Sequence, residues 1–147
     1  MATDVPLRVV CVEDDPDIVE LLRISVEGEP DFELVASTGE ASAVLELLRR
    51  LHPDVVIMDH RLAGVPPPVT TGAVPRRSTV PTGLELVEGA RVALPDATIV
   101  IFTGQSGLQR AARNVGADAC IEKPALADVW PTIREVREDR DHREVTA

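Results

Sequence analysis

Short apolar runs alternate with longer amphipathic stretches along this chain. The runs are rich in β-branched and other aliphatic residues and short enough for buried strands: 7–12, 32–37, 55–59, 98–103 and 119–122. The stretches between and after them repeat their apolar residues at helical spacing: Pro16 to Val26, about Glu40 to Leu51, about Gly83 to Leu94, Leu108 to Asn114, and from about Asp128 onward. This alternation predicts an α/β fold, a parallel sheet with helices on both faces.

Boundary signals mark the first and last helices. Pro16 suits the first turn of a helix, and Asp15 is placed to cap it. Four apolar residues are expected to form one inward stripe on this helix: Ile18, Leu21, Leu22 and Val26. Pro131 is tolerable only in the first turn of the last helix. From Arg137 to Ala147 the charges alternate, which predicts a solvated helix end or a frayed terminus, with residues 139–147 as a charged tail.

The segment from Gly64 to Thr82 interrupts the alternation. It contains five prolines and has no apolar periodicity. It is also long for an ordinary connection between a strand and a helix. We therefore expect an inserted loop, flexible or partly extended, at about residues 64–82.

Chemically reactive side chains follow four of the five predicted strands. Glu13, Asp14 and Asp15 follow the first strand, and one reactive residue follows each of the third, fourth and fifth: Asp59, Thr103 and Lys123. The second strand ends in Ser37 and Thr38. In open parallel sheets, ligands bind beyond the carboxyl ends of the strands. A strand order of 2-1-3-4-5 explains the pattern, because it leaves the second strand at an edge and brings the other four together.

This set of side chains suits phosphoryl transfer to an aspartate. Asp14 and Asp59 would repel each other unless a divalent cation lay between them, and Mg²⁺ prefers oxygen ligands. Lys123 is the only lysine among 15 basic residues. Its compact charge suits a phosphoryl oxygen, and the Thr103 hydroxyl can donate a hydrogen bond to another. A carboxylate nucleophile, a metal, a cation and a hydroxyl are the parts that such a transfer needs.

Composition and charge narrow the functional class. The net charge of −10 disfavours direct binding to nucleic acid or to an anionic membrane surface. Two cysteines are too few for a secreted disulfide framework, and we expect Cys11 and Cys120 to be small buried hydrophobes. We find neither a signal peptide nor an apolar stretch near the ~20 residues of a membrane helix. These features predict a cytoplasmic protein.

The reactive segments resemble the receiver domains of two-component response regulators in bacteria. The resemblance covers about residues 5–138 outside the loop, and five segments carry it: VVCVEDDPDIVELL (9–22), PDVVIMDHRLAG (53–64), TGLELV (82–87), IVIFTG (99–104) and GADACIEKP (116–124). It implies a flavodoxin-like, doubly wound, five-stranded parallel sheet of order 2-1-3-4-5. It also implies a signalling switch, not an enzyme acting on an external substrate.

The resemblance assigns roles to individual residues. Asp59 would be the phosphoacceptor, and Thr103 and Lys123 would contact the phosphoryl group. Mg²⁺ would be held by Asp14, Asp59 and the backbone carbonyl of Arg61, with Glu13 assisting through water. The partners would be a histidine kinase or phosphotransfer protein and a downstream protein or output domain. Self-association through the region from the fourth strand to the last helix is left open.

The chain also departs from the family pattern. The loop after Asp59 is longer than usual, and Cys120 occupies a position that is often Tyr or Phe in the family. In the family, that aromatic residue swings inward as the threonine at the end of the fourth strand moves toward the phosphoryl group. With Cys120 at this position, coupling of this kind to Thr103 is in doubt. One alternative is therefore a degenerate receiver that binds a partner without phosphorylation.

Two other folds use similar parts but fit less well. A haloacid-dehalogenase-like phosphatase needs a second aspartate two residues after the nucleophile, where this chain has Arg61. A dinucleotide-binding domain needs a glycine-rich turn after the first strand, and none is present.

Overall fold

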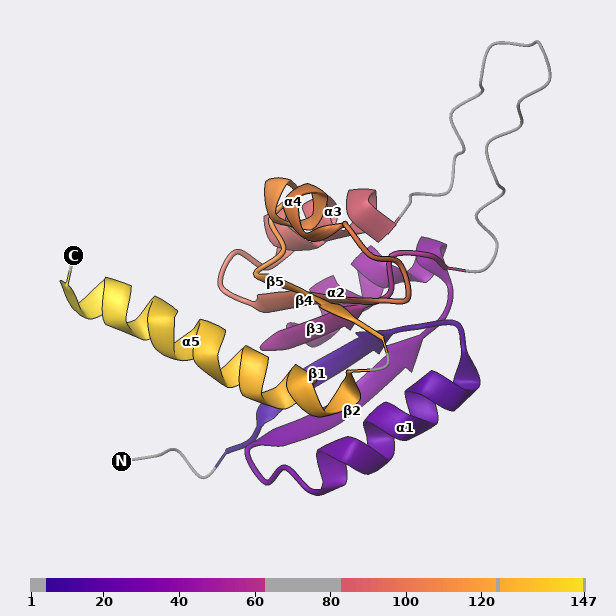
Figure 1. Ribbon diagram of the computed structural model, residues 1–147, viewed down its shortest axis with the longest axis horizontal. Coiled ribbons are helices and arrows are strands. Elements are labelled where there is room, and N and C mark those ends of the chain that lie inside the picture. Colours follow the sequence, from indigo (N-terminus) through magenta and orange to yellow (C-terminus); the bar gives the residue numbers. More distant parts are fainter. Residues whose placement is uncertain (1–4, 63–82, 124, 147) are drawn as a thin grey trace, which may run out of the picture.

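A five-stranded parallel sheet forms the centre of the protein (Figure 1). The computed structural model describes residues 5–62, 83–123 and 125–146. The strands are β1 (Leu7–Val12), β2 (Phe32–Thr38), β3 (Val55–Met58), β4 (Thr98–Thr103) and β5 (Ala119–Glu122). They lie in the order β2-β1-β3-β4-β5. The predicted fold class and strand order are therefore confirmed. The predicted loop at 64–82 lies outside the described residues.

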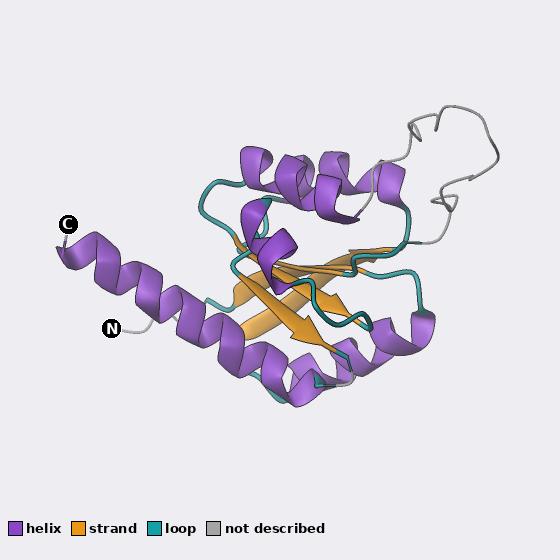
Figure 2. Cartoon of the chain, turned by 45° about the horizontal axis from the view of Figure 1, so that its top comes forward, coloured by secondary structure: helices purple, strands orange, loops and turns teal. Residues whose placement is uncertain are grey.

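Helices cover both faces of the sheet (Figures 1 and 2). The helices are α1 (Pro16–Glu27), α2 (Val44–Leu51), α3 (Gly83–Ala93), α4 (Gln109–Asn114) and α5 (Val129–Thr146), and short 3-10 turns at Ala41–Ala43 and Leu126–Asp128 precede α2 and α5. Helices α1 and α5 lie on one face, and α2, α3 and α4 on the other. Within the described part of the chain, no helix has both the length and the apolarity needed to cross a bilayer.

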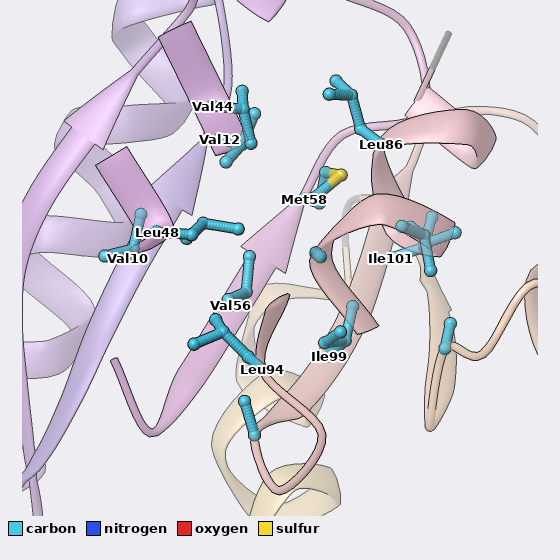
Figure 3. Close-up of a cluster of buried hydrophobic side chains, with 14 of the residues drawn as sticks. Val10, Val12, Val44, Leu48, Val56, Met58, Leu86, Leu94, Ile99 and Ile101 are labelled. Atoms are coloured by element: carbon cyan, nitrogen blue, oxygen red, sulfur yellow. The ribbon is translucent and has the colours of Figure 1, made fainter. Parts of the chain in front are cut away.

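Each face of the sheet has its own apolar core, because successive strand residues point to opposite sides. Val10, Val56 and Ile99 point toward α2 and α3 (Figure 3). Their neighbours Val9 and Val55 point toward α1 and α5. β3 and β4 are buried along their whole length, which is why they read as nearly continuous apolar runs.

The first helix confirms its boundary signals but corrects its apolar stripe. Asp15 caps α1, its Oδ1 accepting a hydrogen bond from the Asp17 amide at 2.9 Å, and Pro16 occupies the first turn. Leu22 and Val26, one turn apart, are buried. Leu21, which we expected to face inward, is 49% exposed. It lies about 100° around the helix from Leu22, which places it beyond the edge of the buried face.

Aromatic packing holds the first half of α5 against α1 and β2. Trp130 is 2% exposed, and its indole N–H donates to the Ser25 hydroxyl at 2.6 Å. Its ring centroid lies 5.0 Å from that of Phe32. The Arg134 guanidinium lies over the Phe32 ring, 5.2 Å from its centroid, and pairs with Asp31. These contacts explain why α5 packs across this face of the sheet.

The second half of α5 is largely the expected solvated helix end, since residues 138, 139 and 141–143 are exposed, but two of its arginines depart from that expectation. The helix continues past residue 138 to Thr146 and extends beyond the sheet (Figure 1). Arg137 and Arg140 are partly buried and donate hydrogen bonds to backbone carbonyls before β3 and β4. Pro131 lies in the first turn, as its missing N–H requires.

Candidate functional site

The carboxyl ends of β1 and β3 bring two acidic residues together. The strands pair in parallel, with Val12 opposite Met58, so Glu13 and Asp59 follow at neighbouring positions. The amide of Asp59 donates to the carbonyl of Val12 at 2.8 Å. Backbone pairing between these strands therefore fixes the origin of both side chains.

Three carboxylates converge at this edge of the sheet. One carboxylate oxygen from each of Glu13, Asp14 and Asp59 lies within 4.8 Å of the other two. Glu13 is 5% exposed and Asp59 8% exposed, whereas Asp14 is exposed. Placing three like charges this close is costly unless a cation shares them. A cluster of hard oxygen ligands with an open side fits a divalent ion such as Mg²⁺.

One ammonium group lies beside the two buried carboxylates. The Nζ atom of Lys123 is 2.9 Å from Oε2 of Glu13 and 3.5 Å from Oδ2 of Asp59. The Lys123 amide donates to the Thr103 carbonyl at 2.7 Å, which anchors the end of β5 to the end of β4. Lys123 also lies over the Phe102 ring, 5.7 Å from the centroid. Lys123 thus pairs with the two buried carboxylates, while the third, Asp14, is exposed.

Burial and hydrogen bonding have opposite effects on the pKa values of Glu13 and Lys123. Burial raises the pKa of Glu13 to about 7, the hydrogen bond from Lys123 opposes that rise, and the nearby charge of Asp59 adds to it. Burial would lower the pKa of Lys123, but its hydrogen bond to Glu13 and the charge of Asp59 raise it overall. The ammonium is therefore charged at neutral pH and available to an anionic group.

Space for a substrate group opens next to Asp59. A cavity of about 460 Å³ is lined by Asp59, His60, Arg61, Thr103, Gly104, Gln105 and Lys123. Thr103 is 1% exposed, and its hydroxyl oxygen accepts from the Gln105 amide at 3.1 Å, which leaves the hydroxyl proton to donate elsewhere. A Cβ built on Gly104 would meet nothing within 4 Å, so this rim is open.

The residues after Asp59 turn back toward it. The amide of Arg61 donates to Oδ1 of Asp59 at 3.3 Å, and the role of its carbonyl as a metal ligand stays a prediction. The Nδ1 atom of His60 is buried without a hydrogen-bond partner in the described part of the chain. Burial lowers the pKa of His60, which favours the neutral ring. This agrees with a packing role for His60.

The structure brings all the predicted side chains to one edge of the sheet and adds residues that the sequence did not single out. Phe102 lies beneath Lys123, and two glycines, Gly39 and Gly83, touch the backbone of the loops that carry Glu13, Asp14 and His60. A sequence signal existed for the glycines. Gly39 directly follows a strand end and Gly83 opens a helix, where residues with a side chain are usually preferred.

An open α/β sheet with an acidic cluster, a threonine and a lysine at its carboxyl end is the architecture of a receiver domain. The chain belongs to the family described as the response regulator receiver domain, whose model matches residues 9–131.

Curated relatives and solved structures agree with this family. The transcriptional regulatory protein PdtaR of Mycobacterium tuberculosis is 32% identical over 148 residues, covering 97% of this chain and 62% of PdtaR. A protein-glutamate methylesterase/protein-glutamine glutaminase of Myxococcus xanthus is 33% identical over 78 residues, covering 53% of this chain and 22% of that protein. The chain thus spans less than two thirds of these relatives.

The same fold occurs in the receiver (REC) domain of AraT, a response regulator from Geobacillus stearothermophilus. It matches with a TM-score of 0.70 and 23% identity, and the match covers 95% of this chain and 99% of that one. At this identity the likeness concerns the fold.

Proposed function

We propose that this receiver domain is a phosphorylation switch that accepts a phosphoryl group on Asp59 from a histidine kinase or phosphotransfer protein. One observation carries the proposal: the Asp59 carboxylate lies in a three-carboxylate cluster, 3.5 Å from the only lysine of the chain. Placed elsewhere, a buried aspartate would be a structural liability. Beside an open cavity it is a positioned nucleophile.

Each side chain of the site has a part in the transfer. A carboxylate oxygen of Asp59 attacks phosphorus, the bond from phosphorus to the donor nitrogen breaks, and the imidazole of the donor leaves with the electron pair. The product is an acyl phosphate on Asp59. Lys123 and Thr103 neutralise and hydrogen-bond the phosphoryl oxygens as charge shifts onto them.

The acidic cluster also fits the metal that receiver domains use. Asp14, Asp59 and the Arg61 backbone carbonyl would hold Mg²⁺, and Glu13 would assist through water. When bound, Mg²⁺ supplies positive charge between the acceptor carboxylate and the phosphoryl oxygens. Glu13 already has Lys123 as a hydrogen-bond partner, which suits an indirect role.

The output of the switch would be a change of partner at the surface formed by β4, β5 and α5. β4 ends at Thr103, β5 ends one residue before Lys123, and α5 is the next α-helix after Lys123. The partner would be a downstream protein, an output domain or a second copy of this chain, and the setting would be the cytoplasm. The acidic chain itself is not expected to bind nucleic acid directly.

The test is phosphorylation of the wild type against Asp59→Asn. Each protein is incubated with acetyl phosphate, with and without Mg²⁺, and followed by intact mass. We expect one added phosphoryl group on the wild type only, and only with Mg²⁺. Equal modification of both proteins would move the acceptor elsewhere.

The alternative is a degenerate receiver that binds its partner without phosphorylation. Cys120, partly exposed in β5 where the family often has an aromatic residue, keeps this alternative in view. Beryllofluoride, which mimics the acyl phosphate, separates the two. No change in mass or in chemical shifts with acetyl phosphate or beryllofluoride and Mg²⁺ would favour the degenerate receiver.

A further inference from the structure

Gly39 touches the loop that carries two of the site carboxylates. Gly39 directly follows β2, and a Cβ built on it would lie 2.9 Å from Cα of Asp14 and 3.2 Å from the carbonyl oxygen of Glu13. The contact is with backbone, which cannot rotate away as a side chain can. The loop from Glu13 to Asp14 therefore occupies its observed place only because residue 39 has no side chain.

Gly83 makes an even closer approach on the other side of the site. A Cβ at this first residue of α3 would lie 2.2 Å from the carbonyl oxygen of His60 and 2.5 Å from its Cα. His60 joins Asp59 to Arg61. Any side chain at position 83 would push either α3 or the Asp59–Arg61 segment aside.

The other glycines of the described chain lack this feature. The nearest atom to a Cβ on Gly28 would be 3.6 Å away, an ordinary contact. A Cβ on Gly89 would meet the end of the Leu45 side chain at 3.0 Å, and one on Gly116 the Arg91 side chain at 3.1 Å. Among these glycines, only Gly39 and Gly83 would place a Cβ against backbone at under 3.0 Å.

We propose that Gly39 and Gly83 are positioning residues that set the spacing of the acidic cluster from two sides. The inference rests on the proposed function, in which the acidic cluster binds Mg²⁺ and Asp59 accepts a phosphoryl group. Gly39 acts through the placement of Glu13 and Asp14. Gly83 acts through His60 on the neighbouring residues Asp59 and Arg61.

The required precision supports this assignment. Relieving a contact of 2.2 or 2.9 Å to an ordinary separation moves backbone by several tenths of an ångström or more. Mg²⁺ demands near-ideal octahedral oxygen geometry, and functional sites tolerate displacements of only about 0.5 Å. A methyl group at either position would therefore press on the backbone that carries the cluster.

Substitution of the two glycines should affect Mg²⁺ binding and phosphorylation differently. Gly39→Ala displaces Asp14, so we expect about 10-fold to 100-fold weaker Mg²⁺ binding, the usual loss when a support of a metal ligand is altered. Its phosphorylation should recover at saturating Mg²⁺. Gly83→Ala displaces the acceptor segment, so we expect its phosphorylation rate to stay at least about 10-fold below wild type at saturating Mg²⁺.

The experiment measures three quantities on the whole chain: thermal unfolding without metal, the Mg²⁺ dissociation constant by calorimetry, and the rate of modification by acetyl phosphate at saturating Mg²⁺. Gly28→Ala and Gly89→Ala are the matched controls and should bind Mg²⁺ and react within about twofold of wild type. The proposal is overturned if folded Gly39→Ala and Gly83→Ala also match wild type in both binding and rate.

A measurement on the wild type covers the case in which a variant does not fold. Backbone amide resonances are followed by NMR during a titration with Mg²⁺ and then beryllofluoride. Gly39 and Gly83 should shift more than Gly28 and Gly89, and equal small shifts would overturn the proposal. A wild type that neither binds Mg²⁺ nor reacts refutes the proposed function itself, whereas a reactive wild type with unaffected glycine variants refutes only this inference.

Discussion

Charged side chains are paired differently at the two ends of the sheet. At the amino end, before β4 and β5, Asp118 accepts hydrogen bonds from Arg91 at 2.7 Å, Arg140 at 3.2 Å and the Ile99 amide at 2.8 Å. The same arginines also donate to the carbonyl of Ala97. At the carboxyl end, two buried carboxylates share Lys123.

This difference separates a structural network from a chemical one. The arginine guanidinium has five donors in a fixed fork, so it can satisfy several fixed acceptors at once. At the amino end, the hydrogen bonds of Asp118 and its two arginines hold α3, β4, β5 and α5 together. At the carboxyl end, Asp59 and Lys123 line an open cavity beside the other two carboxylates, which suits the proposed binding of a cation and of a phosphoryl group.

The largest effect should come from Lys123→Ala at the carboxyl end. The substitution removes the ammonium that lies 3.5 Å from Asp59, and the proposed phosphorylation should slow roughly 100-fold or more. The measurement is the initial rate with acetyl phosphate at saturating Mg²⁺, followed by intact mass. Arg113→Ala, an exposed residue of α4, is the control. A rate within about twofold of wild type would remove Lys123 from the transfer.

The next effect should be on stability, from Asp118→Ala at the amino end. Its side chain is 17% exposed and holds two arginines and a backbone amide, so its loss should lower the free energy of unfolding by about 2–3 kcal/mol. Urea unfolding measures this. Glu20→Ala breaks an exposed pair with Arg23 and should leave the midpoint of urea unfolding close to that of the wild type.

The same variant sharpens the contrast between the ends. At saturating Mg²⁺, folded Asp118→Ala should be phosphorylated at a rate close to wild type, because its contacts lie at the far end of the strands from Asp59. A large loss of rate with little loss of stability would show that the two networks are not separate.

The smallest effect should come from Asp31→Asn, which breaks the more exposed pairing with Arg134. The hydrogen bond from Arg134 lowers the pKa of Asp31, so its ionised form favours the folded state. That stability is present above the ordinary pKa of 3.8 and is lost as the pH falls through the lowered pKa. Because the Asp31 side chain is 47% exposed, we expect only about 0.5 kcal/mol at pH 7.

Urea unfolding of wild type and Asp31→Asn at pH 7, 5 and 3 checks this sign. The difference should persist at pH 7 and 5 and shrink by pH 3. A difference that grows as the pH falls would contradict the assigned pairing.

The convergence of the site was predictable because parallel strands impose it. Residues at the carboxyl ends of neighbouring strands must meet, so Asp59 and Thr103 could be placed from the order of the runs alone. The burial of the strands was equally readable, since runs apolar at every position need cover on both faces.

Features that depend on packing between distant segments were not predictable. Leu21 is 49% exposed although its neighbour Leu22 is buried, because only one side of α1 packs against the rest of the protein. The closer approach of Lys123 to Glu13 than to Asp59 depends on side-chain conformation. Arg140 was expected in a solvated tail, yet it reaches Asp118, because α5 continues across the end of the sheet.

The tryptophan at the start of α5 gives the protein a built-in optical probe. Trp130 is the single tryptophan of the chain, and it lies seven residues after Lys123 in the sequence. Trp130 is 2% exposed and packed against Ser25 and Phe32, so we expect the short-wavelength emission of an indole shielded from water. A movement of α5 away from α1 would admit solvent and shift that emission to longer wavelengths, so the emission would report whether the proposed phosphorylation moves α5.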